Sequence, residues 1–262
     1  MEEYERSDYE LSDYTVSNVI DDIIDYELNT GRKKLISKIS DNINFKYNSF
    51  NIFLGKQGTG KTTSILKELM KLSTIKNDYH LIIYVSNNSS DDTFNKLKNY
   101  INIPIVKTDY QHLNQQFEQL IKLKDTYNKM IDGETEKNPE ILANLYINDF
   151  SKDRLHTFIL MDDAAFVLKN ENNPWFKWLC QLRHLNTTVA LCLQIWKSIN
   201  PSLKSQITSI SIFKGYSRQQ LNFIYQQIAV DVDFNEFMRM YNKLNTRQKL
   251  IIDCVEGQIK IN

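Results

Sequence analysis

The sequence predicts an α/β protein with a mainly parallel central sheet flanked by helices. Short, continuous apolar runs of the kind typical of buried parallel strands recur along the chain. Helix-like segments separate these runs, so we expect crossover connections between neighbouring strands. The first run leads directly into a glycine-rich loop and an amphipathic helix. After this first strand, we expect strands over residues 81–85, 103–106, 158–161, 189–193, 210–213 and 250–254.

The glycine-rich loop lies in residues 51–70, which read NIFLGKQGTGKTTSILKELM. The spacing Gly55-x4-Gly60-Lys61-Thr62 is that of a P-loop, in which glycines let backbone N–H groups turn towards phosphate oxygens. We expect Lys61 to reach the β- and γ-phosphates and the Thr62 hydroxyl to bind Mg²⁺. The predicted nucleotide contacts are Gly55, Lys56, Gln57, Gly58, Thr59, Gly60, Lys61, Thr62 and Thr63.

A second part of this site is predicted at residues 158–163, FILMDD, where two carboxylates follow four apolar residues. A central strand here would place Asp162 beside the P-loop, where it holds Mg²⁺ directly or through water. Asp163 would then orient and deprotonate the attacking water. A strand that simply ends in a polar turn gives the same pattern, but the P-loop upstream favours the functional interpretation.

Other candidates are single residues with weaker signals. Gln194 ends the apolar run 189–193 and could sense the γ-phosphate or position water; it could also be an ordinary strand-end glutamine. Arg183 could reach a neighbouring subunit's nucleotide as an arginine finger, and Arg218 is the second candidate for this role. For His184, capping a helix and lining the site remain alternatives.

The domain organisation follows from length and charge. At 262 residues with 42% hydrophobic content, the chain suits one large domain, which we place at residues 48–262, with a hairpin at its C-terminal end. Residues 1–47 form a predicted extension with an amphipathic helix over 16–28. Residues 1–30 hold ten acidic side chains and one basic one. The rest of the chain, residues 31–262, which we call the body, therefore holds 22 acidic and 31 basic residues. A basic body fits an anionic partner such as nucleic acid, although a lysine-rich solvated surface explains it as well.

The cysteines and the apolar runs indicate a compartment. Cys180, Cys192 and Cys254 are odd in number and far apart, so we expect reduced thiols and a reducing environment such as the cytosol. The apolar runs are too short and too often interrupted for a membrane span.

Several classes of P-loop protein are disfavoured, because the chain lacks the Asn-Lys-x-Asp, Leu-Ser-Gly-Gly-Gln and Asp-Glu-x-Asp/His signatures.

The segment 182–194, LRHLNTTVALCLQ, together with the motifs above, resembles the genome-packaging ATPases of large DNA viruses. That family, of the poxvirus type, belongs to the FtsK–HerA superfamily of P-loop NTPases. Its pattern is a P-loop, an apolar strand ending in Asp-Asp, and Arg-His-Leu-Asn-Thr running into a strand that ends in Gln. The matching segments here are 55–63, 158–163, 183–187 and 189–194, and residues 249–254 are also similar.

This resemblance implies a RecA/FtsK–HerA-like fold and a Mg²⁺-dependent ATPase that drives double-stranded DNA into a preformed capsid as a homo-oligomeric ring. By motif position it makes Lys61 and Thr62 the nucleotide and Mg²⁺ residues, Asp162 the metal-binding acid, Asp163 the catalytic acid and Gln194 the sensor. Arg183 matches the family's arginine. Further implied partners are capsid or portal-vertex proteins, in the host cytoplasm or on the virion. The acidic extension before residue 48 departs from the family pattern, and no nuclease domain is apparent.

Two other functions remain open at this point. One is a loader or segregation ATPase that acts on replicating DNA, and the other is a nucleotide-dependent scaffold or switch without useful hydrolysis. Lysines near residues 86–100 and 197–204 are the candidate DNA contacts.

Overall fold

The computed structural model describes residues 45–75, 79–86, 94–95, 98–163 and 172–262, which belong to one compact unit spanning Asn44–Asn262. The helix expected over 16–28 lies outside these residues. Phe45 is buried and its ring packs on those of Phe53 and Phe158. In the part of the chain that is described, none of the helices combines the length and apolar character that crossing a membrane requires.

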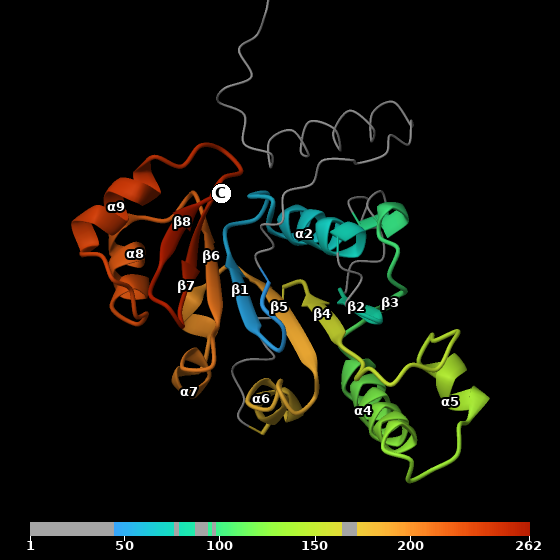
Figure 1. Cartoon of the computed structure of the whole chain (residues 1–262). Coiled ribbons are helices and arrows are strands. Elements are labelled where there is room, and N and C mark those ends of the chain that lie inside the picture. Colours follow the sequence, from blue (N-terminus) through green and yellow to red (C-terminus); the bar gives the residue numbers. More distant parts are fainter. Residues whose placement is uncertain (1–44, 76–78, 87–93, 96–97, 164–171) are drawn as a thin grey trace, which may run out of the picture. The chain divides into compact units, whose positions relative to one another are not determined.

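The centre of the unit is an eight-stranded sheet with the strand order β3-β2-β4-β5-β1-β6-β7-β8 (Figure 1). The first six strands in this order are parallel, and the last two are added antiparallel as a C-terminal hairpin. The strands are β1 (Phe50–Leu54), β2 (Leu81–Val85), β3 (Ile105–Thr108), β4 (Thr157–Met161), β5 (Thr187–Leu193), β6 (Ser209–Phe213), β7 (Lys249–Asp253) and β8 (Ile259–Ile261). The predicted mainly parallel sheet with a closing hairpin is therefore confirmed.

Five of the described helices, α5 to α9, begin after a residue whose side chain caps the helix N-terminus. Asn138, Asn173, Asn200, Ser217 and Asp233 each accept a hydrogen bond from a backbone N–H of the first turn that follows. The α-helices are α2 (Lys61–Ile75), α4 (Leu113–Ile131), α5 (Pro139–Asn144), α6 (Pro174–Leu179), α7 (Pro201–Lys204), α8 (Arg218–Tyr225) and α9 (Phe234–Asn242), and short 3-10 helices are η1 (Lys98–Tyr100) and η3 (Trp196–Ser198).

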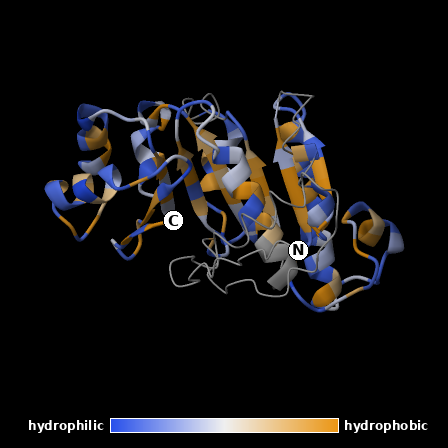
Figure 2. Cartoon of the chain, turned by 90° about the horizontal axis from the view of Figure 1, so that it is seen from above, coloured by the Kyte–Doolittle hydropathy of each residue, from blue (hydrophilic) through white to orange (hydrophobic). Residues whose placement is uncertain are grey.

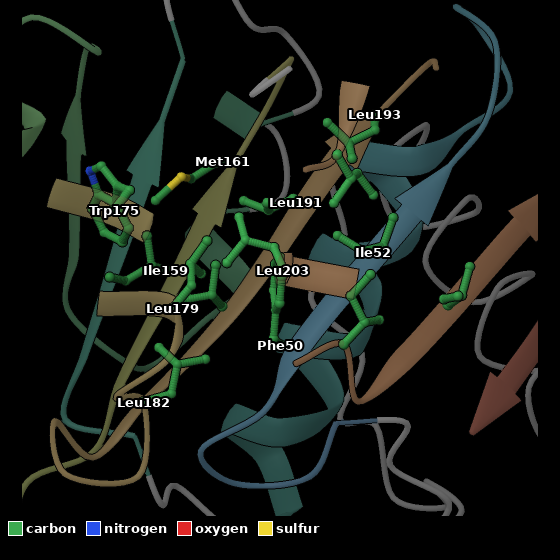
Figure 3. Packing of buried hydrophobic residues seen from close by; sticks show 14 of the residues in the cluster. Phe50, Ile52, Ile159, Met161, Trp175, Leu179, Leu182, Leu191, Leu193 and Leu203 are labelled. Atoms are coloured by element: carbon green, nitrogen blue, oxygen red, sulfur yellow. The ribbon is translucent and has the colours of Figure 1, made fainter. Parts of the chain in front are cut away.

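Both faces of the sheet are covered, as the sequence predicts for buried parallel strands. Strands β1, β2, β4 and β5 are buried along their whole length and form the apolar interior seen in Figure 2. One face packs on α4, α6 and α7 through a hydrophobic cluster that includes Ile52, Ile159, Leu191, Trp175 and Leu203 (Figure 3). The alternate residues of the strands face away from this cluster. They pack beside the buried side of α2, which contributes Ile65, Leu66, Leu69 and Met70 to the core.

The topology determines where a site can lie. Because β1, β2, β4, β5 and β6 are parallel, their carboxyl ends meet at one edge of the sheet. In open α/β sheets ligands bind outside these carboxyl ends. The loop before α2 and the residues that follow β4, β5 and β6 all lie at this edge, which we call the carboxyl edge.

Candidate nucleotide-binding site

The P-loop connects β1 to α2 at the carboxyl edge. Gly55 must lack a side chain, since a Cβ there would lie 2.4 Å from Thr59 Oγ1 and 3.0 Å from Phe213 Cβ. Gly60 has a φ of 89°, a backbone conformation that residues with a side chain rarely adopt. The loop then enters α2 at Lys61, which leaves the unpaired N–H groups of the first turn facing the loop.

Lys61 and Thr62 begin α2 directly after the loop. Lys61 is buried, and its ammonium group donates hydrogen bonds to the carbonyl oxygens of Gly55, at 2.8 Å, and Lys56, at 3.1 Å. The ammonium is thus held inside the curve of the loop. The Thr62 hydroxyl donates to Asp162 Oδ2 at 2.9 Å. The backbone N–H of Asp162 in turn donates to Val85 O at 3.0 Å, which fixes the residue directly after β4.

Asp163 and Gln194 meet across the carboxyl edge. Gln194, directly after β5, donates from Nε2 to Asp163 Oδ1 at 3.1 Å, and both residues are exposed. Asp163 has a φ of 59°, in the left-handed region that aspartate tolerates better than most residues. The sequence pattern and the geometry therefore bring Lys61, Thr62, Asp162, Asp163 and Gln194 together at one edge of the sheet.

The arginine candidates do not join this group. Arg183 and His184 are exposed in the turn between α6 and β5, before β5 begins at Thr187. They therefore lie at the opposite edge of the sheet from Gln194, which follows the end of the same strand. Arg218 begins α8, shortly after β6 ends, and so lies nearer the carboxyl edge, where its guanidinium is 5.4 Å from the ring centre of Phe234.

Two tyrosines that the sequence analysis does not single out hold the backbone of the site. The Tyr110 hydroxyl, just after β3, donates to the carbonyl oxygen of Asp162 at 2.5 Å. The Tyr216 hydroxyl, just after β6, donates to the carbonyl oxygen of Gln194 at 2.8 Å. Burial, followed by the charge of Asp162, raises the pKa of Tyr110, and burial raises the pKa of Tyr216. Both phenols therefore stay protonated and act as donors.

A short chain of hydrogen bonds connects the site to α9. The Tyr241 hydroxyl donates to Phe213 O at 2.9 Å and accepts from the backbone N–H of Tyr216 at 3.0 Å. Tyr216 contacts Gln194, which contacts Asp163. The loop after β6 also approaches the P-loop, since a Cβ on Gly215 would lie 3.6 Å from Lys56 Cδ.

Cys192 lies beneath the site on β5. Its thiol is fully buried and within hydrogen-bonding reach of the Thr62 and Asp162 side chains, and burial, then the Asp162 charge, raises its pKa. As expected, Cys180, Cys192 and Cys254 are all free. In sequence, the signal for Tyr110, Tyr216 and Cys192 is position alone, because each lies in or just after a strand that ends at the carboxyl edge.

Comparison with solved structures finds likeness in the fold. The genome-packaging NTPase B204 from Sulfolobus turreted icosahedral virus 2, in complex with ATP-gammaS, matches with a TM-score of 0.57 and 18% identity, over 82% of this chain and 97% of that one. B204 of Sulfolobus turreted icosahedral virus, a DNA-packaging ATPase, matches with a TM-score of 0.56 and 16% identity, over 83% and 98% of the two chains.

This chain shares its fold with B204. A structure of ATPases 2 and 3 of EssC from Geobacillus thermodenitrificans also matches, with a TM-score of 0.51 and 16% identity, over 79% of this chain and 38% of that one. No protein-family model and no curated protein matches the sequence. These likenesses show the fold alone, and the function is argued from the site.

Proposed function

We propose that this chain is a Mg²⁺-dependent ATPase that translocates double-stranded DNA into a viral capsid. The observation that carries the proposal is the pair of contacts at the mouth of the P-loop, Thr62 with Asp162 and Asp163 with Gln194. A phosphate cradle, a metal-binding acid and a second acid beside it are the parts that nucleotide hydrolysis needs. The likeness to B204 supports this choice of reaction but does not by itself assign it.

The residues of the site fit a nucleotide with a metal ion. Gly55 leaves the loop free for close approach, and Lys61 is held at the inside of its curve. Among the described residues, no group of three or more His, Cys, Asp or Glu side chains could hold a metal. Mg²⁺ does not require such a cluster, because it is usually bound by one or two carboxylates together with phosphate oxygens and water. Thr62 and Asp162 supply suitable oxygen atoms.

In the proposed mechanism each side chain has a separate task. When bound, Mg²⁺ neutralises charge on the β- and γ-phosphates. The Lys61 ammonium binds the same phosphates, and the loop N–H groups bind their oxygens. Asp163 orients the attacking water and accepts its proton. Gln194 holds the Asp163 carboxylate through its amide, while Tyr110 and Tyr216 fix the two backbone carbonyls on either side.

The DNA part of the proposal is supported by charge and by the resemblance of the motifs. Residues 31–262 hold nine more basic than acidic side chains, which favours a polyanionic partner. Copies of the chain would form a ring around the duplex, next to capsid or portal-vertex proteins, in the cytoplasm of an infected host or on the virion. Contacts to the phosphate backbone would make binding depend steeply on salt and little on sequence.

The decisive measurement is ATP hydrolysis with and without long duplex DNA. The proposal expects Mg²⁺-dependent turnover that duplex DNA stimulates and that rising salt suppresses. Turnover unaffected by DNA, together with binding to a replication helicase, would favour a loader or segregation ATPase. Nucleotide binding without turnover would indicate a scaffold or switch.

A further inference from the structure

The connection from β5 to β6 lines a cavity of about 910 Å³ on the face of the sheet opposite α2. This connection starts at Gln194 on the carboxyl edge, passes through η3 and α7, and reaches the opposite edge where β6 begins. The far wall is formed by α8 and the residues after it. We call this cavity the Lys197–Lys204 pocket. Its lining residues are Lys197, Ile199, Pro201, Lys204, Ser205, Ile207, Ile210, Phe223, Gln227, Ile228, Ala229 and Cys254.

Two ammonium groups lie over one aromatic ring in this pocket. Lys197 Nζ is 4.8 Å from the ring centre of Phe223, and Lys204 Nζ is 5.9 Å from the same centre and 5.3 Å from that of Trp196. Of the described residues, those that line the pocket include neither an aspartate nor a glutamate. Burial lowers the pKa of Lys204, so the charged form lacks full compensation in the protein alone. An anion beside the two lysines would supply that compensation.

A short segment that begins at Gln194 joins the pocket to the carboxyl edge, and hydrogen bonds to Gln227 hold it in place. Gln194, which contacts Asp163, is only three residues before Lys197. The Trp196 indole N–H and the Lys204 ammonium both donate to Gln227 Oε1, at 3.1 Å and 2.6 Å. An anion that draws Lys204 towards it therefore acts on a network that holds the segment directly after Gln194.

We propose that the Lys197–Lys204 pocket binds the phosphate backbone of DNA and that its occupation stimulates hydrolysis through the segment beginning at Gln194. This inference rests on the proposed function. Lysine ammoniums are point charges that attract phosphates without reading sequence, and the apolar walls can contact the sugars. An acidic peptide is the competing occupant. DNA is the occupant that the proposed function calls for, and the polyglutamate measurement below distinguishes it from an acidic peptide.

The test replaces both lysines in the full chain with glutamine, Lys197→Gln and Lys204→Gln, which removes charge but keeps much of each apolar stem. We expect basal ATP hydrolysis to be unchanged and stimulation by duplex DNA to be lost. Loss of two phosphate contacts should also reduce the slope of log affinity against log salt by about 1.8. A Lys197→Arg, Lys204→Arg variant, which retains both charges, should keep stimulation and slope.

The matched control is Lys177→Gln with Lys243→Gln, two exposed lysines outside the pocket, which should behave as wild type. Thermal unfolding of each variant checks that the fold is intact. If the pocket variant keeps the wild-type DNA stimulation and salt slope, the inference is overturned. It is also overturned if DNA binding is unchanged while binding of a polyglutamate peptide is lost. Absence of any DNA binding by the wild-type chain would instead refute the proposed function itself.

Discussion

At the scale of single residues, the backbone at Asp163 decides where its carboxylate points. The Tyr110 hydroxyl donates a hydrogen bond to the carbonyl oxygen of Asp162. This carbonyl belongs to the peptide unit that joins Asp162 to Asp163, so the hydrogen bond restricts rotation of that unit and with it the φ of Asp163. The resulting φ of 59° directs the side chain across the edge to Gln194. A residue in this conformation costs free energy that its surroundings must offset, and such residues cluster at functional sites.

Replacement of Asp163 by asparagine tests its role as the base. Asparagine tolerates the same left-handed conformation, so the fold should persist. The amide cannot accept a proton from water at neutral pH, and we expect turnover to fall roughly 10²- to 10⁴-fold with nucleotide affinity retained. Single-turnover hydrolysis and nucleotide titration measure the two effects. Asp149→Asn, at an exposed position on the same chain, is the control. Normal turnover in Asp163→Asn would remove this carboxylate from the mechanism.

Tyr110→Phe tests whether the carbonyl of Asp162 must be held. One hydrogen bond is worth about 1 kcal/mol net, so we expect kcat to fall about fivefold while KM for ATP stays the same. A purely structural role would lower the melting temperature without this split between kcat and KM. Tyr146→Phe removes a hydroxyl from an exposed tyrosine and should change neither value. A kcat equal to that of wild type would show that Tyr110 does not position the acid.

The sequence identifies the residues that carry a local signal and misses those that depend on the strand order. Lys61 and Thr62 follow from the glycine spacing, and Asp162 from the apolar run before it. Tyr110 reaches Asp162 only because β3, β2 and β4 are neighbours in the sheet. Neighbouring strands are far apart in sequence, and no spacing rule along one chain encodes their order.

At the scale of elements, a buried lysine joins α4 to the turn before β5. Lys124 donates to the carbonyl oxygens of Leu185, at 2.5 Å, and Asn186, at 3.0 Å, and to Thr157 Oγ1 at 3.3 Å. The Leu185 carbonyl also accepts from the Thr187 hydroxyl at 2.9 Å, and the Asn186 carbonyl from the Thr157 N–H at 3.0 Å, so Lys124 adds a link from this turn to α4. Asn186 has a φ of 45°, so the turn depends on contacts that hold it in a strained conformation.

The charge of Lys124 should make stability depend on pH. Burial lowers its pKa from 10.5 to about 7, so between these values the unfolded chain binds the extra proton. Stability then rises with pH across this window, with a slope of up to about 1.4 kcal/mol per pH unit from this group. Urea unfolding at pH 7 and pH 9 should show this rise in wild type and not in Lys124→Met. The exposed Lys122→Met should keep it, and equal slopes in all three proteins would contradict the assignment.

Individual elements are predicted well where they are apolar and continuous. Strand β2 has the predicted bounds, and β4, β5 and β6 differ only by one or two residues at the start. Helices α8 and α9 are not predicted from the sequence, because with eight and nine residues they are shorter than the windows in which helical periodicity is read. Between α4 and α5 the helical structure is interrupted, and Pro139 opens α5, because proline suits the first turn of a helix.

At the scale of the whole molecule, the two arginine candidates differ in which copy of the site they can serve. Arg183 lies before the start of β5, whereas Asp163 lies at the carboxyl edge, where β5 ends. The length of this seven-residue strand, roughly 23 Å, therefore separates the end of the sheet near Arg183 from the end near Asp163. Arg183 can therefore assist hydrolysis only at a site in another copy. Arg218 lies on the side of the sheet that carries its own P-loop. The two arginines thus predict opposite results when defective subunits are mixed.

Mixing inactive subunits distinguishes these cases. In the proposed mechanism, Asp163→Asn subunits lack the base but keep Arg183, whereas Arg183→Ala subunits keep Asp163, Gln194 and the P-loop residues. If Arg183 acts on a neighbour, mixed assemblies should hydrolyse ATP faster than either variant alone, because some intact sites then face an intact arginine. The matching mixture with Arg218→Ala should show no such gain if Arg218 serves its own site. Wild-type turnover in Arg183→Ala alone would exclude Arg183, and a gain with Arg218→Ala would assign the intersubunit role to that residue instead.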